Sequence, residues 1–152
     1  MSIDAAISQC PVFQGVPLTR ARALLAGGQQ RTIATGEILI DEGLPNEHLH
    51  LVLSGRLRVM LPINESRFRT VHLADLEMGA LTGEYSAFDQ RPASARVSAV
   101  ETTVLLSQRA HAFTAALDQD PETAKHVYRN LLELLIERLR ATDAEAEVII
   151  PV

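Results

Sequence analysis

One stretch near the middle of the chain carries the side chains best suited to bind a ligand. Gly83 and Glu84 begin a short apolar turn of helix that continues through Tyr85 and Ser86 to Phe88. A helix start led by glycine presents backbone N–H groups that lack partners and attract anions. A carboxylate beside them can accept hydrogen bonds from two sugar hydroxyls, although an acidic residue is also favoured at a solvent-facing helix start. The pattern predicts a cradle for a sugar phosphate.

Two histidines form a second candidate site. His48 and His50 stand at i and i+2 of an expected strand, so their rings project to the same side and can chelate a metal. A protein site generally needs at least a third ligand, and the positions that follow hold Ser54 and Gly55. We therefore expect two ordinary polar residues on a surface-facing strand, with no metal.

The sequence nominates no catalytic nucleophile. Cys10, the only cysteine, lies beside Pro11 without an evident histidine partner, and neither a Gly-x-Ser-x-Gly motif nor a P-loop occurs. We expect a protein that is not an enzyme and holds no cofactor. The single cysteine excludes an intramolecular disulfide framework and suits a reducing compartment.

Composition limits the remaining classes. With 152 residues, 47% of them hydrophobic, the chain can bury one core, which predicts a single domain over residues 1–152. A net charge of −5 argues against binding to nucleic acid or an anionic membrane, which both require a dense basic patch. There is no secretory signal pattern and no apolar run near the ~20 residues of a membrane helix. We expect a cytoplasmic protein.

The elements that must position these residues are mainly strands with flanking helices. Helices are predicted over about residues 1–28, with Thr19 as the N-cap of the second helix and Gly27 and Gly28 ending it. From Gln29 the hydrophobic period changes to two, which predicts a small barrel or sandwich over 29–106. Ser54 and Gly55 are typical of a tight hairpin turn. The expected strands cover 32–34, 36–40, 49–53, 56–61, 69–73 and 97–106.

The C-terminal part, about residues 107–147, is predicted to be helical. Asp120, Pro121 and Glu122 fit the start of a helix that continues to about Ala146, followed by an apolar tail of strand character over 147–152. The apolar arc of this helix is wider than one contact surface requires. It therefore predicts either a homodimer built on Leu131, Leu135 and Leu139 or a helix lying deep in a groove of its own domain.

A family resemblance rests on three segments in order. Gly36-Glu37-x-Leu-Ile-x-Glu42-Gly43, then Leu49-x-Leu-Val-Leu-Ser-Gly-Arg-Leu-x-Val59, and then the stretch from Gly83 resemble cyclic-nucleotide-binding domains over roughly residues 13–140. These are the sensor domains of catabolite-activator-like regulators and cyclic-nucleotide-dependent kinases. The resemblance implies an eight-stranded double-stranded β-helix, or jelly-roll barrel, with a long C-terminal helix. It also implies cyclic AMP or cyclic GMP as the ligand, and the helical dimer of bacterial members.

The phosphate-binding cassette departs from the family at one position. The family's Pro-Arg-Ser-Ala-Thr-Val pattern falls on Pro92-Ala93-Ser94-Ala95-Arg96-Val97, so Ala93 stands where the resemblance places the phosphate arginine. Arg91 lies two residues earlier and is a candidate replacement, whereas Arg96 is expected to point into water. Arg138 is expected to snorkel, and it is a minor candidate because family members place this helix near the ligand.

The expected function is a stand-alone regulatory module that senses a ligand, with cyclic nucleotide binding weakened or lost. The ligand site is expected to comprise Gly83, Glu84, Tyr85, Ser86, Arg91, Ala93 and Ser94. An unidentified output protein would detect the position of the C-terminal helices. The alternatives are a nucleotide-free scaffold for protein interaction and a cupin-like metal-binding enzyme.

Overall fold

The computed structural model describes residues 2–149, with side chains through residue 144. Three short helices precede the strands: α1 (Ile3–Gln9), the 3-10 helix η1 (Pro11–Phe13) and α2 (Leu18–Leu24). The strands are β1 (Gln29–Ile33), β2 (Ile38–Ile40), β3 (His48–Ser54), β4 (Leu57–Leu61), β5 (Val71–Leu76), β6 (Leu81–Thr82), β7 (Arg96–Ala99) and β8 (Thr103–Arg109). The other helices are α3 (Glu84–Asp89), α4 (Ala110–Gln119) and α5 (Pro121–Ile149).

The strands form two antiparallel four-stranded sheets, in the orders β1-β8-β3-β6 and β2-β7-β4-β5. The mainly β class, the jelly-roll arrangement and the long C-terminal helix are confirmed. The barrel, however, is not closed, because the two sheets pack face to face and keep separate edges at β1, β6, β2 and β5. The segment 97–106, expected to be β, belongs to two strands, β7 and β8, and each joins a different sheet.

The turn at Gly55 joins the two sheets. The prediction of a hairpin is wrong, because β3 pairs with β8 and β6 whereas β4 pairs with β5 and β7. Gly55 has φ +90°, and an added Cβ would lie 2.5 Å from the Thr102 carbonyl oxygen. Only glycine therefore fits this crossing without displacing the backbone.

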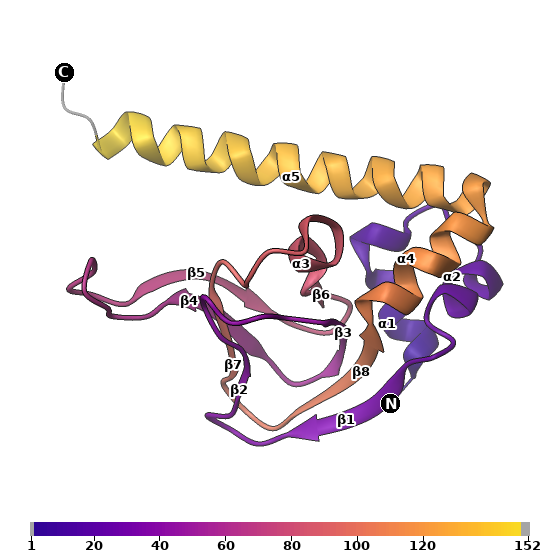
Figure 1. The fold of residues 1–152 in the computed structure, drawn as a ribbon, viewed down its shortest axis with the longest axis horizontal. Coiled ribbons are helices and arrows are strands. Elements are labelled where there is room, and N and C mark those ends of the chain that lie inside the picture. Colours follow the sequence, from indigo (N-terminus) through magenta and orange to yellow (C-terminus); the bar gives the residue numbers. More distant parts are fainter. Residues whose placement is uncertain (1, 150–152) are drawn as a thin grey trace.

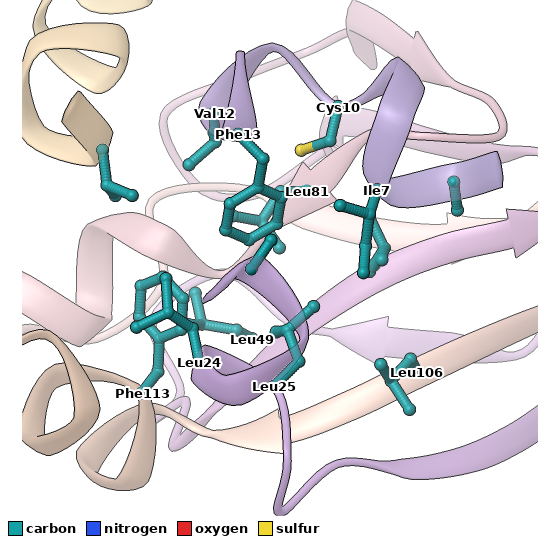
Figure 2. Packing of buried hydrophobic residues seen from close by; sticks show 14 of the residues in the cluster. Ile7, Cys10, Val12, Phe13, Leu24, Leu25, Leu49, Leu81, Leu106 and Phe113 are labelled. Carbon is teal, nitrogen blue, oxygen red and sulfur yellow. The ribbon is translucent and has the colours of Figure 1, made fainter. Parts of the chain in front are cut away.

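Two apolar clusters lie on opposite sides of the sheet that contains β3. Leu49 on β3 and Leu106 on β8 face the helices, in one cluster with Phe13, Leu24 and Phe113 (Figure 2). Apolar residues at the alternate positions of each strand point the other way, into a second cluster between the two sheets. This alternation follows from the two-residue period of a strand, and it leaves β3 buried on both faces.

The helix boundaries differ from the sequence expectation in part. The cap of α2 is Pro17 rather than Thr19, and its carbonyl accepts the N–H groups of Arg20 and Ala21. The predicted start of α5 is confirmed, because the Asp120 carboxylate accepts hydrogen bonds from the Thr123 backbone N–H at 3.3 Å and hydroxyl at 2.5 Å. Residues 147–149 are helical, not strand-like, and the rest of the expected tail lies outside the described residues.

Helix α5 runs the length of the molecule, from the N-terminal helices past α3 and onward above the β4–β5 end (Figure 1). Its first half packs onto the domain through Val127 and Leu131, both buried. Leu139, further along, is 61% exposed. Leu131 is therefore part of the protein's own core, so the expectation that it contributes to a dimer interface is wrong.

Candidate functional site

A cavity of about 460 Å³ lies between β4–β5, the turn before α3, the 93–97 segment and α5. Its lining combines aliphatic side chains from the strands with polar groups from the cassette and from α5. The predicted residues Gly83, Glu84, Tyr85, Ser86, Ala93 and Ser94 all lie in this lining, and Arg91 does not. Arg91 is exposed, and its backbone N–H donates to the Asp89 carboxylate at 2.9 Å.

Gly83 sets the direction of the short helix α3. It is the N-cap residue and has φ +89°, in the left-handed region that glycine adopts at low cost. An added Cβ would clash with the His48 carbonyl oxygen. The Asn46 amide fixes the turn by donating to His48 at 3.0 Å and to the Gly83 carbonyl at 3.5 Å. Sequence reasoning missed Asn46, which also lines the cavity.

Glu84 is held by a residue from the far end of the chain. Arg138 on α5 lies 3.2 Å from the Glu84 carboxylate, donates to the Tyr85 hydroxyl at 2.8 Å and stands 5.8 Å above the Tyr85 ring centre. Burial disfavours the Arg138 charge, but the hydroxyl and carboxylate outweigh it and raise the guanidinium pKa. The Glu84 side chain is 13% exposed and that of Arg138 is 49% exposed. We call these three residues the α5 latch.

Ala93 lies in the floor of the cavity. Its side chain packs against the apolar cluster between the sheets. Its backbone N–H donates to the Leu44 carbonyl, and its own carbonyl accepts from the Gly43 N–H, both at 2.9 Å. Neither its side chain nor its backbone amide is therefore available to an anion.

The arginines near the cavity are already paired with carboxylates. In the lining, Arg138 contacts Glu84. The ring of His72, also in the lining, lies 2.9 Å from the Asp75 carboxylate. Arg96 does not point freely into water as expected, because it binds Asp41 at 2.9 and 3.3 Å and lowers the Asp41 carboxyl pKa. An anion entering the cavity would lose water without meeting an unpaired cation in the described lining.

The two histidines do not form the expected surface pair. His50 is buried in the middle of its sheet, and its Nδ1 lies 2.7 Å from the Ser107 hydroxyl. Burial, together with the nearby Arg31 and His48, lowers the pKa of His50 to about 3. Among the described residues, no three histidine, cysteine or acidic side chains are grouped to hold a metal.

Cys10 is buried in the cluster beneath the N-terminal helices (Figure 2). Burial raises the pKa of its thiol to about 11. A thiol in this environment stays protonated at neutral pH and is a poor nucleophile.

Several lining residues carried no sequence signal of a site. Val71 and Leu73 on β5, and Ala141 and Thr142 on α5, all line the cavity. The alternation of apolar and polar residues identifies β5 as a strand, but it does not indicate which cavity the strand borders. The α5 residues lie more than forty positions from the cassette in sequence, and only the fold brings them to it.

Comparison with known proteins places the chain in a family. Residues 30–120 match the model of the cyclic nucleotide-binding domain. The chain is 32% identical over 139 residues to the Cyclic AMP receptor protein of Thermus thermophilus, a match that covers 91% of this chain and 62% of that protein. The crystal structure of the Thermus thermophilus Catabolite Activator Protein is similar with a TM-score of 0.78 and 31% identity, over 91% of this chain and 62% of that one.

A further relative is Glutaminase 1 of Bradyrhizobium diazoefficiens, 27% identical over 143 residues, which are 94% of this chain and 22% of that protein. The chain thus spans less than two thirds of each of these relatives. Among the described residues, no helix is long and apolar enough to cross a membrane. The matched region includes residues of every strand of both sheets and the whole cassette, and the chain therefore belongs to the cyclic nucleotide-binding domain family.

Proposed function

We propose that the protein is a non-enzymatic regulatory module that senses a small ligand in this cavity, and that its binding of cyclic AMP and cyclic GMP is weak or lost. The observation that carries the proposal is Ala93, which stands in the apolar floor with its backbone amide already bonded. A contact between arginine and phosphate is bidentate and contributes about 1.5–3 kcal/mol per hydrogen bond. Its absence corresponds to about a hundredfold or more in affinity.

The signal would pass through the α5 latch. Glu84 is the carboxylate placed to accept hydrogen bonds from a ligand hydroxyl, and it is also the group that Arg138 contacts. A ligand that uses Glu84 competes with Arg138 and so biases the position of α5. A partner that recognises α5 would then respond to the ligand. We propose that this partner is an output protein. We further propose that the chain itself binds neither nucleic acid nor a membrane and that it is located in the cytoplasm.

The exposed face of α5 supports a homodimer. Leu132, Leu135, Ile136 and Leu139 form an exposed apolar stripe along the helix beyond the buried Leu131. Two such stripes pack together in a helical pair, as in a coiled coil. We therefore propose a dimer built on Leu135 and Leu139 together with Leu132 and Ile136.

The same stripe also favours the second candidate, a scaffold that binds another protein and no nucleotide. An exposed apolar patch marks an interaction surface whether or not the cavity is used. The cupin-like metalloenzyme has no comparable support, because the ring of His50 is buried and bonded to Ser107. We expect no stoichiometric transition metal in purified, dialysed protein, and metal analysis would test this.

Restoring the charge at position 93 tests the proposal. In calorimetric titrations with cyclic AMP and cyclic GMP, we expect weak or no binding by the unmodified protein and at least about tenfold tighter binding by Ala93→Arg. Adding Glu84→Ala should remove the gain, because one side chain would hold the phosphate and the other the ribose.

Arg91→Ala provides the matched control, since Arg91 lies outside the lining and its loss should not matter. Tight binding by the unmodified protein that is lost in Arg91→Ala would show that the loop moves this arginine into place. No gain by a well-folded Ala93→Arg protein would refute the proposal.

A further inference from the structure

The chemistry of the cavity indicates which ligand it would take, and this step rests on the function proposed above. The floor is aliphatic, formed by Ile40, Val59, Leu76, Leu81, Ala93 and Val97. The volume of about 460 Å³ is within the range of small-molecule sites in proteins.

One wall of the cavity leaves apolar surface uncovered. Val71 and Leu73 lie on β5, the edge strand of its sheet, and both line the cavity. They are 41% and 52% exposed. Large aliphatic side chains at the wall of a cavity gain free energy when an apolar ligand covers them. A ligand with an apolar body therefore fits this wall better than a hydrated one.

Glu84 and Arg138, the two charged side chains of the lining apart from any charge on His72, are paired with each other before any ligand arrives. A ligand with a net charge would have to break the pair of Glu84 and Arg138 or remain without an opposite charge in the lining. A hydroxyl or amine N–H, in contrast, can donate to Glu84 without adding charge.

We infer that the ligand is an uncharged small molecule with a mainly apolar body and one hydrogen-bond donor directed at Glu84, rather than a nucleotide. The ligand's hydrogen-bond donor orients it at the end of the cavity formed by the cassette, and its apolar body fills the space along β5. Such a ligand engages the α5 latch without any contact at position 93.

Two fluorescent probes of the same shape test this inference. N-phenyl-1-naphthylamine is neutral and carries one N–H donor, and 8-anilinonaphthalene-1-sulfonate is the same ring system with an anionic group. We expect saturable binding of the neutral probe at one site, at least about tenfold tighter than that of the sulfonate. Ala93→Arg should shift this preference toward the sulfonate.

The location of the probe is tested by a pair of matched variants. Leu73→Asp places a charge at the wall and should weaken binding of the neutral probe about tenfold or more. Ile38→Asp is the control, because Ile38 lies on the other edge strand of the same sheet, is 46% exposed and does not line the cavity. It should leave the affinity unchanged.

The results for this inference and for the proposed function can be told apart. The inference is overturned if the sulfonate binds as tightly as the neutral probe or if the neutral probe does not saturate. It is also overturned if Leu73→Asp has no effect, because the probe then lies outside this cavity. In all of these cases, a gain of cyclic AMP affinity in Ala93→Arg leaves the proposed function standing. Failure of that gain removes the proposed function separately.

Discussion

The α5 latch makes a quantitative prediction about coupling between the helix and the cassette. Arg138 contacts Glu84 at 3.2 Å and the Tyr85 hydroxyl at 2.8 Å. A charged hydrogen bond contributes about 1.5–3 kcal/mol when sheltered from water, but a surface ion pair contributes only about 0–1. Because Arg138 is half exposed, we expect an interaction energy near the boundary, about 1 kcal/mol.

A double-mutant cycle measures this energy. Arg138→Met keeps the apolar stem of the side chain and removes its charge, and Glu84→Gln removes the charge of the partner. Urea midpoints of the two single variants and the double variant, compared at a common slope, give the interaction energy. Arg140→Met is the matched control, since Arg140 lies on the same helix but borders the groove beside η1. It should show no coupling to Glu84→Gln.

The same variants show whether Arg138 competes with the ligand for Glu84 or contacts the ligand itself. If Arg138 competes with the ligand for Glu84, Arg138→Met in the Ala93→Arg background should raise cyclic AMP affinity by up to about fivefold, which corresponds to about 1 kcal/mol. Additivity of the two stability changes within about 0.3 kcal/mol would refute the latch. A loss of affinity in Arg138→Met would show that Arg138 contacts the ligand instead of competing with it.

Two further predictions concern the dimer and the buried histidine. Leu135→Glu or Leu139→Glu should yield monomer or insoluble protein. Leu131→Ala should instead lower the free energy of unfolding by about 2–5 kcal/mol, because Leu131 is buried. If light scattering shows the unmodified protein to be a monomer at high concentration, the dimer is contradicted. Because the pKa of folded His50 is about 3, below its ordinary value of 6.5, the unfolded chain binds an extra proton on acidification. Stability from this group is therefore complete above pH 6.5 and falls toward pH 3 by about 1.4 kcal/mol per unit, so His50→Asn should flatten the slope of unfolding free energy between pH 6.5 and 5.

The starts of α3 and α5 were predictable from sequence because short-range rules decide them. A glycine in the left-handed region directly before an acidic residue starts α3 in the cassette, and Asp120 caps α5. Which strands pair is not decided locally. Ser54 and Gly55 therefore correctly predicted a turn, but the predicted pairing of the strands on either side of it was wrong. The helical wheel of α5 likewise shows a wide apolar arc. It cannot show that the domain beneath the helix covers Leu131 and leaves Leu139 exposed.

The contacts that complete the site link positions far apart in the chain. Arg138 is 54 residues from Glu84, and Asn46 is 37 residues from Gly83. The family resemblance made Arg138 a minor candidate without indicating its partner, and Asn46 carried no signal in the sequence. Their roles follow from the path of α5 above the roll and from the approach of β3 to the cassette (Figure 1).

The alanine in the floor and the arginine on α5 have a joint consequence for sensing. In a site where a cation in the floor holds the ligand's phosphate, that charged contact lies away from the helix through which we propose that the signal passes. Here the floor is apolar, and the cation that the structure places at Glu84 comes from α5 itself. The polar group of a ligand and the helix therefore compete for one carboxylate. A ligand shifts a conformational equilibrium only through a differential interaction with its two states. In the mechanism that we propose, competition for Glu84 supplies that difference without any phosphate.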